Sequence, residues 1–276
     1  MTETAAPRGR WGIMLSLVVL SAPIILMYSW LLVASFSVRI TGLVPHGFTL
    51  ENWRFLGRAL PNEASIWTTT LNSLLFAFAV GILEVLIGSM AAYALSRLNF
   101  AGRGVVLSST MVLHSFPSVT LLIAIFLVLR FLGLYDRLAG VILVKLALDL
   151  PLGIWIMKGF FDNVPWDIEM AALIDGCSRL RIWWRVMVPL VKPGLLAFGI
   201  FAFLSGWNEF LLPYVLLPSQ NSQTLSVLMA SLASEERFAD YGLVTAVSVF
   251  YILPAVLVFA LTQKYLLNIF SGGVKG

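Results

Sequence analysis

The stretch FDNVPWDIEMAALIDGCSRLRIWWRVMVPLVKPG, residues 161–194, is the most polar part of an apolar chain of 276 residues. Eight charged residues lie between Asp162 and Lys192, although charged residues make up only 12% of the chain and hydrophobic residues 59%. A soluble domain has about 25% charged residues. A charged segment between long apolar runs is where such a chain can contact a soluble partner.

The apolar runs on both sides predict a polytopic membrane protein, because about 18 consecutive apolar residues can cross the hydrocarbon core. The mean hydropathy of +0.92 agrees. We expect an all-α fold with six transmembrane helices, at about residues 11–37, 67–95, 105–132 (interrupted at Phe116-Pro117), 139–161, 193–217 and 241–266. Three regions follow: residues 1–66 with the tail, the first helix and an extracytoplasmic loop, a transmembrane domain at 67–266 that contains the charged loop 162–192, and a tail at 267–276.

Motifs for chemistry or for a bound group are not found in the sequence. The lone Cys177 excludes an internal disulfide and most cysteine-based metal sites, and we interpret it as an ordinary buried or loop thiol. A glycine-rich nucleotide loop, zinc-ligand spacing and a nucleophile elbow are all missing. We therefore expect no catalytic residue, metal or cofactor in this chain and, at a net charge of only +4, no nucleic-acid partner.

Basic residues are distributed unevenly between the two faces that six helices would create. The face with the termini, the 96–104 turn and the charged loop carries eleven of them: Arg8, Arg10, Arg97, Arg103, Lys158, Arg179, Arg181, Arg185, Lys192, Lys264 and Lys275. The opposite face carries six: Arg39, Arg54, Arg58, Arg130, Arg137 and Arg237. Basic loops stay in the cytoplasm, so both termini and the charged loop are expected there.

Within the charged loop the pattern predicts two short helices. The first begins at Pro165, a favoured first helical position, with Asn163 as a candidate cap, and Gly176 breaks it. The second has Ser178 as its cap and ends at Pro189 and Pro193. In the first helix a bulky stripe (Trp166, Met170, Leu173 and Ile174) opposes a flatter face (Ala171, Ala172 and Asp175). Pattern alone also allows an amphipathic pair at the lipid interface, anchored by Trp183 and Trp184.

The spacing of this loop resembles the EAA loop of ABC-importer permeases. That family pattern is Glu-Ala-Ala, three residues, Gly, nine residues, then Ile-x-Leu-Pro, and the residues that match it in register are Ala171, Ala172, Asp175, Gly176 and Pro189. Val186 and Val188 replace Ile and Leu. Trp207-Asn208-Glu209-Phe210 and the tail 272–276 look like carbohydrate permeases of the maltose-transporter type in their second-subunit (MalG-like) form, and the resemblance covers about residues 72–276.

The resemblance implies a type I ABC importer architecture in the bacterial inner membrane. The EAA loop would form a cytoplasmic coupling helix that docks in a cleft of a partner ATPase dimer, which binds ATP and Mg. The other implied partners are a second homologous permease, an extracytoplasmic solute-binding protein, a carbohydrate substrate and membrane lipid. Met170 stands where the family has Glu, and Glu169, about 100° away, is not expected to replace it fully. We therefore expect a more apolar contact there.

Ionisable residues inside the spans are functional candidates, because burying charge in lipid is costly. Lys145 and Asp149, spaced i,i+4, form either a self-neutralising pair or a polar lining of a translocation path. Trp207, Asn208 and Glu209 would suit sugar hydroxyls and ring faces, or else bond between helices. His114 lies at the interruption of the third span and is expected to face a channel or packed protein. The role of Glu84 is open, and Asn72 is expected to contact a neighbouring helix.

Three functions compete on this sequence. The leading one is the permease subunit of an ATP-driven importer for a carbohydrate or polyol, working by alternating access. An ion-coupled secondary transporter would use Asp149, Glu209 or Glu84 for protons, but no internal repeat supports it. A membrane scaffold would leave these acids without a purpose. The scarcity of arginine in the spans disfavours a strongly anionic substrate.

Overall fold

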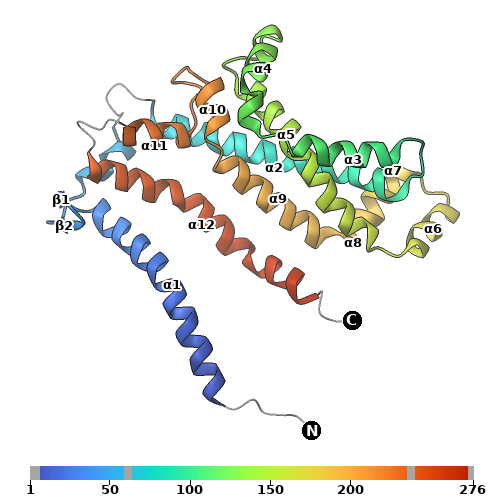
Figure 1. The fold of residues 1–276 in the computed structure, drawn as a ribbon, viewed down its shortest axis with the longest axis horizontal. Helices are drawn as coiled ribbons and strands as arrows, with labels where there is room; N and C mark the ends of the chain where they lie inside the picture. Colours follow the sequence, from blue (N-terminus) through green and yellow to red (C-terminus); the bar gives the residue numbers. More distant parts are fainter. Residues whose placement is uncertain (1–6, 59–63, 235–239, 273–276) are drawn as a thin grey trace. The chain divides into compact units, whose positions relative to one another are not determined.

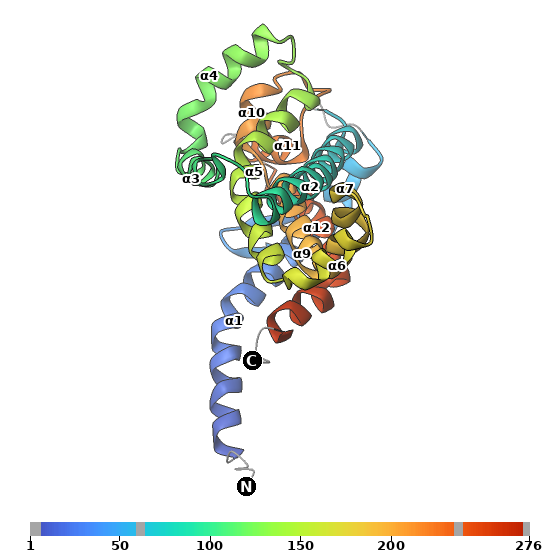
Figure 2. The same ribbon diagram turned by 90° about the vertical axis from the view of Figure 1, so that its right-hand side faces the viewer.

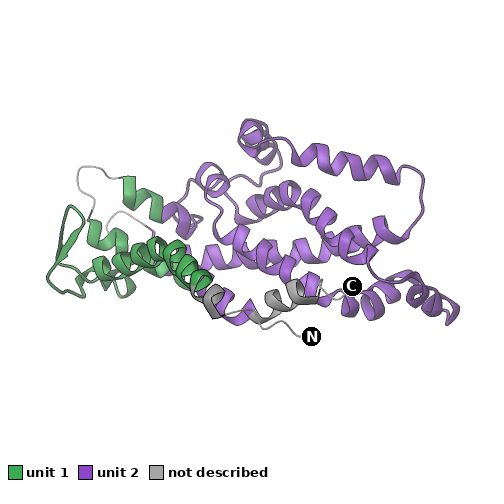
Figure 3. Cartoon of the chain, turned by 60° about the horizontal axis from the view of Figure 1, so that its bottom comes forward, with its two compact units in different colours: residues 1–59, 229–253 green, residues 60–228, 254–276 purple. Residues whose placement is uncertain are grey.

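The computed structural model describes residues 7–58, 64–234 and 240–272, with side chains from residue 12 to residue 263 within these ranges. The tail motif at 273–276 and the acidic residues Glu235 and Glu236 lie outside them. The chain divides into two compact units, residues 1–59 with 229–253 and residues 60–228 with 254–276 (Figure 3). Each unit is described by itself.

The first unit contains the first span and the segment after it. Helix α1 covers Pro7–Ser35, and its apolar window is only 6% buried. A hairpin of two short strands follows, β1 (Arg39–Thr41) antiparallel to β2 (Val44–His46), then the 3₁₀ helix η1 (Glu51–Leu56). The hairpin is an addition to the all-α expectation. The amide of Asn52 ties η1 to the end of α1 by donating to the carbonyls of Ser35 (3.1 Å) and Ser37 (2.9 Å).

Three helices form the body of the second unit. Helices α2 (Ile66–Arg97), α5 (Leu138–Asp162) and α9 (Lys192–Trp207) lie side by side, with α2 packed against both others (Figures 1 and 2). Small residues allow the close approach: Gly81 and Gly206 have no room for a larger side chain, because a Cβ there would lie 3.0–3.4 Å from the backbone of the facing helix.

Two of the six expected spans are broken. Helix α3 (Arg103–His114) and helix α4 (Ser118–Phe131) meet at an angle of 100°, at the expected Phe116-Pro117 interruption. The 193–217 span is wrong as a continuous helix, because α9 ends at Trp207 and a separate helix α10 covers Leu211–Leu216. Among the described residues, four helices are long and apolar enough to cross a membrane. The number rises to six if two bent pairs count as one span each: α3 with α4, and the segment Arg179–Leu190 with α9, which meet at 85°.

The charged loop folds as two helical segments joined at Gly176. Helix α6 covers Trp166–Ile174, and Gly176 has φ +76°, which a residue with a Cβ rarely adopts. The second segment runs through α7 (Arg179–Ile182), the π-helical turn η2 (Trp183–Met187) and α8 (Val188–Leu190). The Ser178 cap is confirmed, since its hydroxyl accepts from the Arg181 N–H at 3.4 Å. Asn163 instead follows the end of α5, and Pro165 occupies the cap position of α6.

The remaining elements follow the fifth span. The predicted polar loop 218–240 contains a helix, α11 (Leu225–Ser234), whose first four residues are buried. Asn72 contacts this loop rather than a helix, donating to the carbonyls of Asn221 and Gln223 at 2.9 Å each. Helix α12 covers Tyr241–Gly272, six residues further than the expected 241–266 span.

Helix α5 offers a matched test of this packing. A methyl group at Gly140 would overlap the carbonyl oxygen of Leu134, whereas no atom lies within 4 Å of the corresponding position at Gly159. We expect Gly140→Ala to destabilise the protein by about 1–3 kcal/mol through overpacking. Gly159→Ala should be neutral or stabilising, since Ala favours a helix by about 1 kcal/mol over Gly. Thermal unfolding in detergent measures both, and equal melting temperatures would contradict the packing described here.

Candidate functional site

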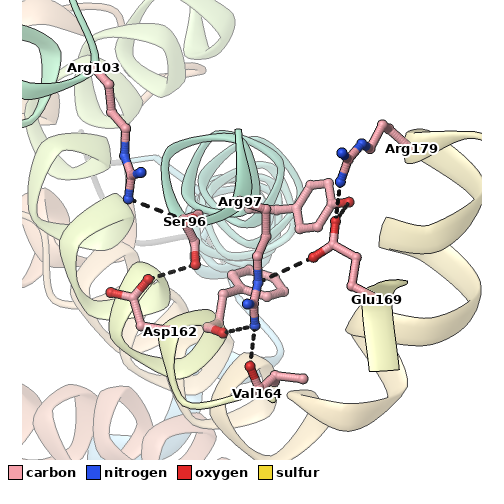
Figure 4. A network of polar contacts seen from close by, with 9 residues as sticks. Ser96, Arg97, Arg103, Asp162, Val164, Glu169 and Arg179 are labelled. Atoms are coloured by element: carbon pink, nitrogen blue, oxygen red, sulfur yellow. Dashed lines mark hydrogen bonds and ion pairs between the residues drawn. The ribbon is translucent and has the colours of Figure 1, made fainter. Parts of the chain in front are cut away.

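The most extensive polar network of the second unit lies where the charged loop meets the ends of α2 and α5 (Figure 4). It centres on Glu169, the single buried residue of α6, whose side chain is fully enclosed. One carboxylate oxygen of Glu169 accepts from the Tyr93 hydroxyl at 2.7 Å and from the Arg179 guanidinium at 2.6 Å. The other oxygen lies 3.4 Å from Nε of Arg97. Glu169 therefore joins α6 to α2 and to α7.

Arg97 extends this connection to α5. Its side chain is buried, and one terminal nitrogen donates to two carbonyl oxygens, that of Phe161 in the last turn of α5 (2.6 Å) and that of Val164 in the turn after it (Figure 4). The guanidinium carbon also lies 4.7 Å from the ring centroid of Trp166 at the start of α6, a cation–π contact. One arginine thus contacts the end of α5, the following turn and α6. We call Tyr93, Arg97, Glu169 and Arg179 the Glu169 clamp.

A second set of contacts lies beside the clamp. Ser96 donates to Asp162 at 2.6 Å, and the same carboxylate pairs with Lys158 at 2.5 Å, one turn earlier in α5. Arg103, at the start of α3, donates to the carbonyl of Ser96 at 3.4 Å (Figure 4). The ends of α2 and α5 are therefore linked to each other and to α3 independently of Glu169.

Burying an ion pair is favourable only when the remaining donors and acceptors are satisfied as well. In the clamp the Tyr93 hydroxyl, Arg179 and two backbone carbonyls supply such bonds. Nε of Arg97 and the facing oxygen of Glu169 form the ion pair itself at 3.4 Å, without a hydrogen bond. Removing one partner of such a pair costs about 3–5 kcal/mol, because the other charge is left buried and uncompensated. The clamp therefore fixes the orientation of α6 much more strongly than an exposed ion pair would.

The faces of α6 differ from the expected ones. The inward face carries Glu169, with Ala172 and Leu173 half-buried against the core, so the expected bulky stripe does not pack as a unit. The exposed side carries Met170 (39% exposed) and Ile174 (86% exposed), together with Ala171 and Asp175. The residues predicted to form the coupling loop are thus divided: Glu169 and Ala172 lie on the inward face of the helix, and Met170 and Ala171 face outward. Pro189 is exposed in α8.

Sequence analysis missed most of the clamp. Arg97 was assigned to a basic turn that begins at residue 96, but α2 continues to Arg97 and buries it. Tyr93 lies one turn earlier on the same helix. A sequence signal existed, because Arg97 and Glu169 are a charged pair flanking two apolar spans. Their meeting depends on how α2, α5 and α6 pack, which no local pattern specifies.

The intramembrane candidates form a separate cluster around Lys145. Its ammonium group lies 2.8 Å from Glu209 and 3.0 Å from Asp149, so the expected Lys145–Asp149 pair is present and has a third member. Glu209 also accepts from the backbone N–H of Leu212 at 3.2 Å, and its own carbonyl accepts from Ser226 at 2.7 Å. The break between α9 and α10 is therefore held to α5 and to the start of α11.

The other predicted path residues lie in different surroundings, and Asp149 of the Lys145 cluster also lines a cavity. Trp207 is buried and stacks on Phe203, so in this structure it is a core residue. Asn208 donates to the carbonyl of Leu204 at 2.9 Å, at the end of α9. His114 and Asp149 line a cavity of about 550 Å³, together with Glu84 and Ser205. Ser205 donates to Asp149 at 3.2 Å, and one oxygen of the buried Glu84 has no hydrogen-bond partner among the described residues.

Comparisons with known proteins agree on one family. Residues 84–267 match the binding-protein-dependent transport system inner membrane component. The trehalose transport system permease protein SugB of Mycobacterium tuberculosis is 30% identical over 96% of this chain and 97% of its own. The diacetylchitobiose uptake system permease protein NgcG of Streptomyces coelicolor is 34% identical over 93% and 86%. The maltodextrin transport system permease protein MdxG of Bacillus subtilis is 30% identical over 92% of each.

A solved structure has the same fold. It belongs to a bacterial ABC transporter involved in the import of the acidic polysaccharide alginate, with a TM-score of 0.73 and 24% identity. The match covers 96% of this chain and 99% of that chain. At this identity the likeness concerns the fold alone.

The clamp can be tested with the chain's own thiol. Cys177 is the single cysteine, half-buried directly after Gly176 and packed against the core that α6 covers. Glu169→Gln should raise its rate of maleimide labelling about tenfold or more. A hydrogen bond to a charged group contributes about 1.5–3 kcal/mol, and each 1.4 kcal/mol is a factor of ten. Asp167→Asn, an exposed acid in the same helix, is the control. Equal rates for the two variants would show that Glu169 does not hold α6.

Proposed function

This chain belongs to the family of inner-membrane components of binding-protein-dependent transport systems, and on that basis we propose that it carries a carbohydrate or polyol across the membrane by alternating access. The named relatives support the substrate class, since they are permeases for trehalose, diacetylchitobiose and maltodextrin. The family and the spanning helices make it an integral inner-membrane protein. The ion-coupled alternative has no support from these relatives.

The observation that carries the mechanism is the Glu169 clamp. A short exposed helix transmits a force only if it cannot rotate independently of the spans. Glu169 and Arg97 fasten α6 to the ends of α2 and α5, and α2 packs along both α5 and α9. We infer that a partner pushing on α6 moves these three helices together, as alternating access requires.

The partner in this proposal is a dimer of ATPase subunits that binds ATP and Mg and receives α6 in a cleft. The docking surface would be the exposed side of α6, where Met170 and Ile174 are apolar and Asp175 is acidic. Glu169 is enclosed and already paired, so it does not supply the carboxylate missing at position 170. The contact at Met170 would therefore be apolar, and the energy for transport would come from the partner.

The other proposed partners complete an importer. A second, homologous permease would form the opposite half of the path, and a solute-binding protein would deliver substrate on the extracytoplasmic face. In this chain we propose the cavity lined by Glu84, His114, Asp149 and Ser205 as part of the path. The Lys145 cluster would hold its wall, because it fixes the α9–α10 break against α5.

The docking proposal predicts the effect of a charge on α6. Ile174 is 86% exposed, so Ile174→Asp should leave the fold intact. In the assembled transporter it should lower the ATPase stimulation caused by substrate-loaded binding protein by about tenfold or more, because a buried unpaired carboxylate costs several kcal/mol. Ile174→Leu, which stays apolar, should retain stimulation. Full stimulation in Ile174→Asp with normal assembly would refute the docking role of this surface.

The orientation is tested separately. In a Cys177→Ser background, Asp175→Cys should react with a membrane-impermeant maleimide only after the cells are permeabilised, because the basic loop is placed in the cytoplasm. Leu43→Cys, between the strands of the hairpin and 79% exposed, should react in intact cells. The reverse labelling pattern would invert the topology and exclude a cytoplasmic ATPase as the partner of α6.

A further inference from the structure

An apolar groove of about 680 Å³ runs along the second unit between α2, α9 and the part of α12 after Pro254. Its walls include Phe78, Leu86, Leu196, Phe203, Leu257 and Leu261, and each of these except Phe203 is more than a third exposed. Helix α2 packs closely on α5 and α9, whereas α12 makes no comparable contact with α2 or α9 among the described residues. The groove is therefore a gap between helices that the chain itself leaves open.

One end of the groove carries hydrogen-bond donors without acceptors. Lys192 lines this end, is exposed, and has no ion pair among the described residues. Trp183 also lines the groove and is only 6% exposed. Its indole N–H has no acceptor in the described structure. Trp184, 60% exposed, stands beside it with the ring centroids 5.6 Å apart. A positive charge and an unpaired donor at the end of an apolar groove favour a ligand with an anionic head and an apolar tail.

The length of the groove fits half of a membrane. From Lys192 to Phe203 helix α9 rises about 16 Å, at 1.5 Å per residue. The hydrocarbon core is about 30 Å thick, so the groove extends over about one leaflet. Tryptophan and lysine are typical of the membrane interface, and the donor end is therefore expected at headgroup depth.

We propose that this groove binds an anionic phospholipid of the cytoplasmic leaflet, with an acyl chain between α9 and α12 and the phosphate at Lys192, beside the Trp183–Trp184 pair. The proposal goes beyond transport. The one part of the proposed function that it requires is the cytoplasmic position of Lys192. A carbohydrate would find almost no polar partner along the walls, and a zwitterionic lipid would bring its own cation close to Lys192. The bound lipid fills the gap beside α9, so it couples α12 to the body of the unit.

Cross-linking in the assembled transporter tests this site. The transporter is reconstituted with phosphatidylglycerol that carries a photoactivatable diazirine in its acyl chain, and labelled peptides are mapped by mass spectrometry. We expect labels on groove residues of α9 and α12. Unlabelled phosphatidylglycerol should compete about fivefold better than phosphatidylcholine, the effect of about one lysine at an anionic membrane surface.

Matched variants separate the head from the tail of the lipid. Lys192→Gln should abolish the fivefold preference for phosphatidylglycerol. The control is Arg137→Gln, which removes an exposed basic residue just before α5, outside the groove lining, and should keep the preference. Leu261→Trp should reduce labelling by filling the groove, and Val256→Trp, 55% exposed on the same helix but outside the groove lining, should not.

The proposal is overturned if the groove is not labelled, if the two lipids compete equally, or if Lys192→Gln keeps the preference. The assembled transporter contains the second permease, so a groove that stays unlabelled there points to a protein helix as its occupant. The orientation test with Asp175→Cys gives an independent result. A failure of the lipid site with correct topology therefore leaves the transport proposal standing.

Discussion

The buried pair between Arg97 and Glu169 is the interaction on which the placement of the charged loop depends. A carboxylate and a guanidinium lose their hydration when they are enclosed, and their attraction compensates only with good geometry and further hydrogen bonds. Here the further bonds come from Tyr93, from Arg179 and from two carbonyls, one in the last turn of α5 and one just after it. Because each contact comes from a different element, the pair is satisfied only when α2, α5, α6 and α7 are all in place. This mutual dependence gives α6 one orientation.

The second constraint is that backbone N–H and C=O groups inside the membrane need hydrogen-bond partners within the protein. A helix that ends inside the membrane exposes carbonyl and N–H groups that no water can satisfy. At the α9–α10 break, Glu209 accepts one such N–H with its side chain, while its carbonyl accepts from Ser226. Lys145 neutralises the carboxylate from the neighbouring helix. The break is therefore compatible with the membrane because polar side chains of three segments meet there.

Together the two networks turn separate helices into one mechanical body. The Glu169 clamp joins α2, α5 and α6 at one end, and the Lys145 cluster joins α5 to the α9–α10 break further along. Close glycine contacts hold α2 against α9 between them. In a family of permeases driven by a partner, a rigid connection from an exposed helix to the spans is the physical requirement for coupling. The apolar groove lies between α2 and α9 of this body and the end of α12, which packs less closely on them and leaves room for a lipid.

The sequence by itself determined the membrane class, the approximate spans, the interruption near Pro117 and the two-helix charged loop with its break at Gly176. These features depend on local properties: hydrophobic length, proline geometry, helix periodicity and the left-handed conformation that glycine permits. It also identified the EAA spacing, and the family comparison confirmed that resemblance. The Lys145–Asp149 pair was predictable because both residues lie one turn apart on one helix.

Only the tertiary structure decided which residues perform which task. Periodicity separated a bulky from a flat face of α6, but it gave no reason to bury Glu169, because its partners come from residues 93 and 97, more than 70 positions earlier. The pairing of Glu209 with Lys145 was not predictable from periodicity either, because the two residues are 64 positions apart in the chain. Trp207 became a core residue once α9 packed against α2. Long-range pairing of charges depends on the packing of whole helices, and the local sequence does not encode it.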